Sequence, residues 1–198
     1  MRLENKAGHK FPSGYPARRV WLELEVTDGQ GGILWQSGQL AEDGMNIVGA
    51  DDGGIESFQP HHDVITDASQ VQIYEFVIAD VTGTPTNLLE RAAITLKDNR
   101  LPPLGFRTDH PAYDTTLVVG ANVEWDMALG DFNRSESGEE GTGADVVHYA
   151  LDIPALNGCE DCNVTARLWY QAMPPRWVAP MFEVETDIIA EFESMYWD

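Results

Sequence analysis

The stretch RRVWLELEVT at residues 18–27 decides the fold class of this chain. Apolar side chains occupy every second position from Val20 to Val26, and a tryptophan and two glutamates stand between them. This period of two is typical of a β-strand with one buried face. A glycine-rich segment at Asp28–Gly32 follows, and Ile33–Trp35 resumes the apolar pattern. The region therefore predicts a β-hairpin.

Other segments extend this pattern. Alternating runs at Val71–Ile78 and Val164–Tyr170 predict two further strands. Weaker strand candidates are Leu117–Trp125 and Asp145–Leu151, Ala92–Leu96 fits either a strand or a short helical turn, and the best helix candidate is Met181–Tyr196.

Long polar loops rich in glycine and proline connect these segments. Short strands with such connections favour an antiparallel β-sandwich over alternating β–α units. We therefore predict a mainly β protein: a single antiparallel β-sandwich domain over residues 1–198, with long loops and a short C-terminal helix. Residues 1–17 are expected to form a loop segment that contacts a preceding or partner domain.

Composition and charge exclude some partners. The chain has 198 residues, 12 basic and 33 acidic, giving a formal net charge of −21, while 43% of its residues are apolar, as in ordinary globular proteins. Because nucleic acid is a polyanion and no basic stripe offsets the charge, we expect no nucleic-acid partner. No run of about 18 apolar residues is present, so we expect no membrane insertion.

The charge is uneven along the chain. Five of the twelve basic residues fall within the first nineteen positions, and none occurs from Val20 to Glu90. The simplest interpretation of the acidic remainder is a solvated surface; the alternative is a surface that binds cations or steers a positively charged partner.

The first candidate site is His9. Glycines and prolines at Gly8, Pro12, Gly14 and Pro16 impose an irregular path before the first long strand, and such a path can expose a histidine at a fixed place. The imidazole could ligate a metal or haem iron, or it could only hydrogen-bond the loop to the sandwich.

A second candidate site lies in the acidic loop that follows the hairpin. His61 or His62 together with Asp63 could form a mixed metal site, although adjacent histidines of an extended segment point to opposite faces. Calcium is the other candidate, with oxygen ligands from Asp51, Asp52 and Glu56.

The two cysteines, Cys159 and Cys162, are separated by Glu160 and Asp161, which disfavour a reactive thiolate. A small disulfide is the favoured interpretation and implies an oxidising compartment. Asn163 follows the pair, so the pattern for covalent haem attachment is absent and no covalently bound cofactor is expected in this chain.

Motifs for catalysis are missing. The sequence has no Gly-x-Ser-x-Gly, no phosphate-binding glycine loop and no His-Glu-x-x-His, so we assign no catalytic residue and expect a non-enzyme. A metalloenzyme that uses His9, His61, His62 or His110 is the third hypothesis.

Three segments together resemble a known family. They are GHKFPSG at residues 8–14 followed by RRVWL at 18–22, VQIYE at 71–75, and KDNRLP at 97–102 with Gly105 and Phe106. In this order they are similar to the haem-free, β-rich C-terminal region of bacterial multihaem c-type cytochromes.

The resemblance implies an exported protein, periplasmic or extracellular, that packs on a haem-bearing domain or subunit in an electron-transfer system. It makes His9, His61 and His62 candidates to approach or ligate a neighbouring haem c. Lys10, Arg18 and Arg19 become the expected docking edge. The family-like part begins at residue 5 and no haem-attachment motif is present, so by this resemblance the haem-bearing part is missing, separate or was never present. An excised domain is one explanation of this pattern.

The leading hypothesis is therefore a non-catalytic accessory domain that packs on a multihaem cytochrome and contributes either a histidine ligand or a docking surface. The alternative is an extracellular binding module, dependent on Ca²⁺ or a transition metal, for glycans or surface assembly.

Overall fold

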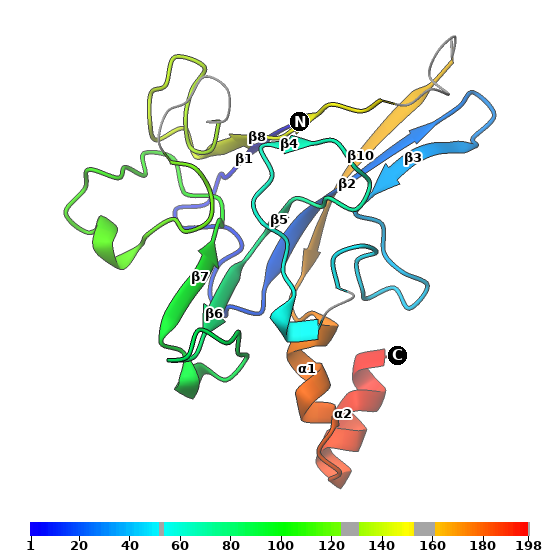
Figure 1. The fold of residues 1–198 in the computed structure, drawn as a ribbon, viewed down its shortest axis with the longest axis vertical. Coiled ribbons are helices and arrows are strands. Elements are labelled where there is room, and N and C mark those ends of the chain that lie inside the picture. Colours follow the sequence, from blue (N-terminus) through cyan, green and yellow to red (C-terminus); the bar gives the residue numbers. More distant parts are fainter. Residues whose placement is uncertain (52–53, 124–130, 153–160, 198) are drawn as a thin grey trace.

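The predicted hairpin forms the centre of the structure. In the computed structural model, which describes residues 1–51, 54–123, 131–152 and 161–197, β2 (Arg19–Thr27) pairs antiparallel with β3 (Ile33–Ser37). Along its other edge β2 pairs antiparallel with β10 (Asn163–Gln171) over nine residues. A short strand, β5 (Ile73–Tyr74), lies beside the start of β2. These strands form the main sheet, in which β10 is an edge strand (Figure 1).

Smaller strand pairs surround this sheet. The pairs are β1 (Arg2–Glu4) with β8 (Ala144–Val146), β4 (Val64–Ile65) with β9 (His148–Tyr149), and β6 (Phe76–Ala79) with β7 (Ile94–Asp98). All are antiparallel except β4–β9, which is parallel. The mainly β, sandwich-like fold class is thus confirmed.

The remaining elements are helical. The structure has short 3-10 turns at Gly54–Glu56, Leu89–Arg91 and Tyr113–Thr115, and two α-helices, α1 (Pro175–Phe182) and α2 (Asp187–Trp197). Both α-helices lie at one end of the molecule, below the sheets in Figure 1. None of the described helices is long and apolar enough to cross a membrane.

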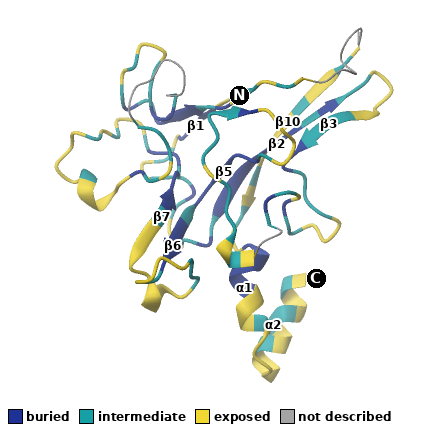
Figure 2. Cartoon of the chain, viewed as in Figure 1, coloured by how far each residue is buried: buried dark blue, intermediate teal, exposed yellow. Residues whose placement is uncertain are grey.

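The β2 strand is buried on both faces, whereas its alternating pattern predicts one buried face (Figure 2). Val20 and Leu22 face one apolar cluster. Trp21 faces a second cluster with Ile47 and Ile73, and its indole Nε1 donates a hydrogen bond to the Gly38 carbonyl at 2.8 Å. The loop after β3 therefore covers the face that the sequence pattern leaves open to solvent.

The predicted C-terminal helix is divided in two. Pro175 stands in the first turn of α1, where a missing backbone N–H costs nothing. Between the helices, the Thr186 hydroxyl accepts a hydrogen bond from the Ile189 N–H at 3.3 Å, as a residue that caps a new helix does. The predicted helix at Met181–Tyr196 is confirmed for its larger part, which forms α2, whereas its first two residues belong to the end of α1.

Other predicted strands shift or divide. The segment Ala92–Leu96 forms part of the strand β7, and Asp145–Leu151 contributes to both β8 and β9. In Leu117–Trp125 the described residues 117–123 form no strand beyond one isolated bridge of Val119 to Asp98, and residues 124–125 lie outside the described residues.

The predicted strand Val71–Ile78 also divides, because Glu75 separates β5 from β6. The Glu75 carboxylate is buried between two cations. Its Oε1 lies 3.1 Å from the Lys97 ammonium, and Arg176 of α1 bonds its Oε2. Burial alone raises the pKa of Glu75, but Arg176, Lys97 and Arg19 more than offset it and lower the pKa to about 2. Glu75 therefore carries its charge inside the protein.

Removing this charge will destabilise the fold. We expect Glu75→Gln to lower the free energy of unfolding by about 3–5 kcal/mol, since it leaves two buried cations without a counter-charge. Urea denaturation measures the change. The matched control is Asp109→Asn, which breaks a bidentate pair with Arg107 at the exposed surface and is expected to cost less than about 1 kcal/mol. Equal costs for the two variants would contradict this role of Glu75.

Candidate functional site

The N-terminal loop is fixed against the corner that follows β7. Phe11 and Leu101 exchange two backbone hydrogen bonds, of 2.9 and 2.8 Å. The Asn5 side-chain amide donates to the carbonyls of His9, Leu101 and Pro102. Two segments that are far apart in the sequence, residues 8–14 and 97–102, therefore form one structural unit.

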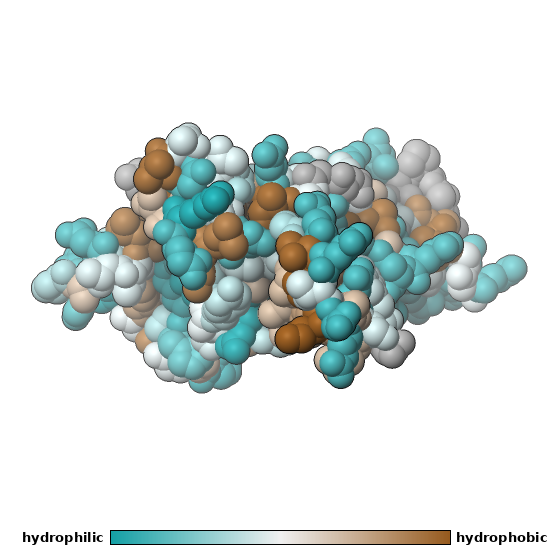
Figure 3. Space-filling model, turned by 90° about the horizontal axis from the view of Figure 1, so that it is seen from below, coloured by the Kyte–Doolittle hydropathy of each residue, from teal (hydrophilic) through white to brown (hydrophobic). Residues whose placement is uncertain are grey.

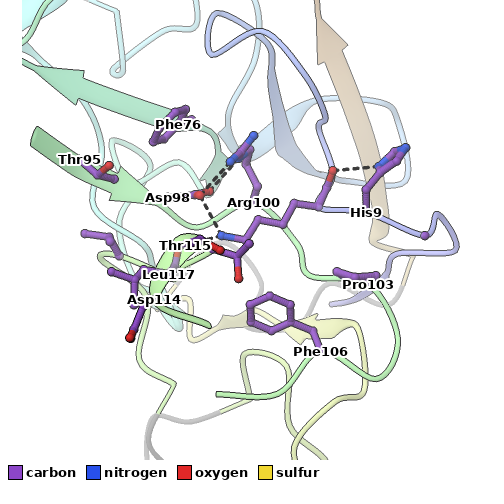
Figure 4. Close-up of a pocket in the computed structure, with 14 residues that line it drawn as sticks. His9, Phe76, Thr95, Asp98, Arg100, Pro103, Phe106, Asp114, Thr115 and Leu117 are labelled. Atoms are coloured by element: carbon purple, nitrogen blue, oxygen red, sulfur yellow. Dashed lines mark hydrogen bonds and ion pairs between the residues drawn. The ribbon is translucent and has the colours of Figure 1, made fainter. Parts of the chain in front are cut away.

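This unit lines a pocket of about 580 Å³ (Figure 4). At its floor Asp98 accepts hydrogen bonds from two cations. The Lys10 ammonium lies 2.8 Å from Asp98 Oδ2, and Arg100 binds both carboxylate oxygens at 2.7 and 2.8 Å. One carboxylate against two cations leaves this trio with a formal charge of 2 − 1 = +1.

An aromatic ring lies beside each of the two cations. The Arg100 guanidinium lies 4.7 Å from the centroid of the Phe76 ring, and the Lys10 ammonium lies 5.7 Å from that of Phe106. Burial lowers the pKa of Lys10, and the charge of Asp98 partly offsets this effect. The pocket thus combines apolar walls with two cations, Lys10 and Arg100, and two carboxylates, Asp98 and Asp114, whose formal charges cancel. Each cation lies beside an aromatic ring, an arrangement that can bind a polar group on a flat or apolar body.

His9 stands at the rim of this pocket, exposed to solvent, with its ring directed away from the interior (Figure 4). Its Nδ1 lies 3.2 Å from the Lys10 carbonyl oxygen. Because a carbonyl can only accept, Nδ1 carries the proton and Nε2 presents its lone pair. Histidines that ligate metals have this arrangement, with one ring nitrogen donating to a carbonyl and the other bound to the metal.

His61 is held in the opposite tautomer. Its Nδ1 accepts hydrogen bonds from the side-chain amides of Gln72, at 2.7 Å, and Asn99, at 3.1 Å. Both amides are oriented by backbone N–H groups that bond their oxygens, those of His62 and Glu75. The proton of the neutral ring therefore lies on Nε2, 3.4 Å from Asp63 Oδ1 and 3.8 Å from Asp145 Oδ2.

The surroundings of His61 are those of an internal network. The His61 side chain is 1% exposed and that of Asp145 is 0% exposed. Tyr74 donates a 2.5 Å hydrogen bond to Asp145, and burial raises the pKa of both groups. His61 and Asp63 thus lie close together, with the His61 ring buried and the Asp63 side chain 20% exposed.

His62 points elsewhere. Its Nε2 lies 2.9 Å from Gln59 Oε1, and burial, together with the charges of Lys97 and His61, lowers its pKa to about 4. His62 is therefore neutral at pH 7 and donates to Gln59.

The two remaining histidines also carry their proton on Nε2. The His110 Nδ1 accepts the Ala112 N–H at 3.1 Å, and the His148 Nε2 lies 2.7 Å from the Asp131 carboxylate. All five histidines lie in the described part of the chain, and His9 is the one whose Nε2 lone pair is both exposed and free.

The other proposed ligands are engaged elsewhere. Both Asp51 oxygens bind Arg19, at 2.6 and 2.7 Å, and Oδ2 also accepts the Ile47 N–H. Glu56 is exposed at the end of a 3-10 turn, and Asp52 lies outside the described residues. Among the residues that the structure describes, no group of three or more His, Cys, Asp or Glu side chains is placed to hold a metal ion.

The expected docking edge is only partly exposed. Arg19 is buried in its pair with Asp51 and cannot contribute to a surface, because its guanidinium neutralises an internal carboxylate. Arg18 is half-buried and donates to the Ser13 carbonyl at 2.7 Å. Of the three predicted residues, Lys10 alone lines the pocket.

Cys162 forms a disulfide. Its predicted partner, Cys159, lies outside the described residues, so that pairing stays a prediction.

A second, apolar hollow of about 700 Å³ lies against α1 and α2, lined by Trp177, Met181 and Phe192 among others. Figure 3 shows this end of the molecule, where hydrophobic residues lie among strongly hydrophilic ones. Glu183, Glu185 and Asp187 stand in the segment between the helices and at the start of α2. The apolar lining of this hollow and the three acidic residues near it disfavour an anionic ligand.

Comparison with family models, with curated proteins and with solved structures finds no match to this chain.

Local sequence patterns do not show the partners that decide which histidine is available. Asp145 and Tyr74 join His61 from strands distant in the sequence, and no local pattern marks either residue. The pocket residues Asp98, Arg100 and Phe106 stand in a segment that could be singled out, but their convergence on Lys10 depends on the fold.

The lowered pKa of His62 predicts a loss of stability in acid. An unfolded histidine titrates near pH 6.5, whereas folded His62 titrates near 4. Between these values the unfolded state binds more protons, so the free energy of unfolding falls as the pH falls. We expect His62→Gln to reduce this fall between pH 6.5 and 4, measured by urea denaturation at several pH values. The control His110→Gln, in an exposed loop, should leave the slope unchanged. A slope that His62→Gln does not alter would refute the assignment.

Proposed function

We propose that this chain is a non-catalytic docking domain of a multihaem cytochrome system, and that His9 supplies an axial ligand to a haem on the partner. The observation that carries the proposal is the state of His9. Its Nδ1 donates to the Lys10 carbonyl, and its exposed Nε2 has a free lone pair. A haem iron with an open axial position takes a neutral imidazole nitrogen in this state.

The surroundings of His9 support a negatively charged partner group. The Lys10–Asp98–Arg100 trio beside it carries a formal positive charge, on a chain whose net charge is −21. Haem propionates are carboxylates, and Lys10 and Arg100, each beside an aromatic ring, are the groups of this pocket suited to hold one near the edge of a porphyrin.

The distribution of acidic residues along the chain supports docking on the side of the molecule that carries His9. The two longest stretches without an acidic residue are 5–22 and 162–182. They lie side by side, because β2 pairs with β10 along its length and the ring of Phe11 stacks on Tyr170 at 6.5 Å. A partner with its own negative groups meets the least repulsion here.

The proposal includes an exported location, periplasmic or extracellular. The disulfide at Cys162 supports an oxidising compartment. The haem belongs to the partner in this proposal, since the present sequence has no haem-attachment motif.

The test uses a haem c peptide with one axial histidine and an open sixth position. Titrating the intact protein into the ferric peptide should convert its spectrum to the low-spin form of a haem with two nitrogen ligands. We expect His9→Ala to weaken this binding about tenfold or more, because the other histidines are buried or protonated on Nε2. Absorption spectroscopy at pH 7 measures both.

The matched controls are His110→Ala and His148→Ala, which remove the other two exposed histidines. Both should bind the peptide as the unaltered chain does. If the low-spin spectrum is absent, or if it persists undiminished in His9→Ala, the ligation proposal is wrong.

A further inference from the structure

The edge strand β10 has one free edge. All nine of its residues, Asn163–Gln171, pair with β2, and no other described strand bonds its opposite side. Its outer backbone N–H and C=O groups therefore face outward. A free edge of this length is a template for another strand.

The face of β10 that continues the main core is also uncovered. Val164, Leu168 and Tyr170 are 66%, 53% and 52% exposed. Their direct partners on β2, namely Val26, Leu22 and Val20, are buried. The apolar face of the main sheet is thus buried at β2 but exposed to solvent at β10.

A hollow of about 330 Å³ borders this apolar surface, lined by Ala166 and Leu168 together with Leu3 and Phe11. The N-terminal segment therefore reaches the strand without filling the space beside it.

The features that usually keep an edge strand from pairing with another strand are absent from β10. The strand has no proline, and its pairing with β2 has no register shift. Its one charged residue, Arg167, is turned to Glu23, at 2.7 Å, and Glu25, at 3.8 Å, on the neighbouring strand. Nothing in this strand opposes pairing with a further strand.

We propose that β10 pairs antiparallel with β10 of a second copy of this chain, about a two-fold axis at Leu168. This register sets Leu168 opposite Leu168 of the other copy. It sets Ala166 opposite Tyr170, a small side chain against a large one, and Arg167 opposite Trp169, a cation against an aromatic ring. An antiparallel pair of identical strands is self-complementary by symmetry, which is why a second copy fits this edge.

Charge supports this edge as the contact. Two chains of −21 repel each other, but β10 lies in the acid-free stretch 162–182. Two copies that meet here bring no carboxylate of one β10 against the other. Salt screens the remaining repulsion, so the dimer should strengthen as ionic strength rises.

The test of this proposal is separate from that of haem ligation, because His9 lies outside β10. A variant that abolishes haem ligation, His9→Ala, should dimerise like the unaltered chain, so failure of either proposal leaves the other standing.

Sedimentation equilibrium of the intact chain over a range of protein and salt concentrations tests the dimer. We expect a monomer–dimer equilibrium that salt shifts to dimer. Leu168→Lys should weaken it about tenfold or more, because it sets two cations opposite each other. The matched control is Ile33→Lys, an equally exposed apolar residue on β3 (60%), which should not change the equilibrium. A chain that stays monomeric up to about 1 mM overturns the proposal, as does equal weakening by both variants.

Cross-linking tests the register without relying on a destabilising variant. Opposed residues of an antiparallel pair have Cα atoms about 4.5–5.5 Å apart, within the range of a disulfide. Leu168→Cys should therefore link two copies under mild oxidation. In Ala166→Cys the two thiols would lie four positions apart, about 13 Å, and should not link. Linking of Ala166→Cys in place of Leu168→Cys would overturn the proposed pairing.

Discussion

The buried charge of Glu75 is the constraint on which the arrangement of the other elements depends. A carboxylate in the interior requires cations, and Lys97 of β7 and Arg176 of α1 supply them. The same Lys97 ammonium donates to the carbonyls of Gln59 and Ile73. One ion cluster therefore fixes β5, β7, α1 and the loop that carries His61. The strand β7 in turn leads into Leu101, which holds the His9 loop.

This constraint also explains what the sequence could and could not predict. The alternation at residues 18–27 predicts the central strand, because a period of two is a local property. Glu75 divides a predicted strand through partners that are distant in the sequence, and no local pattern shows them. The burial of Trp21 also depends on a distant segment. The alternating pattern predicts that its face of β2 is exposed, but the loop after β3 covers it. Local periodicity finds elements, whereas long-range ion pairs decide how they are joined.

For the candidate site, residue type alone could name the histidines but not rank them. The spacing around His9 predicts an exposed imidazole, and the structure has one. His61 is equally plausible from sequence, yet two amides fix its proton on Nε2 and the ring is buried. Which nitrogen carries the proton depends on hydrogen-bond partners that the fold supplies, so the distinction appears only in three dimensions.

The internal ion pairs also change the meaning of the net charge. Three of the twelve basic residues are paired inside the protein: Arg19 binds Asp51, and Lys97 and Arg176 bind Glu75. The solvent-facing surface is consequently left to the acids. On such a surface a docking region is defined less by added cations than by missing carboxylates. Residues 5–17 of the N-terminal loop and β10 are adjacent and contain no acidic residue, so association is less opposed on that side of the molecule.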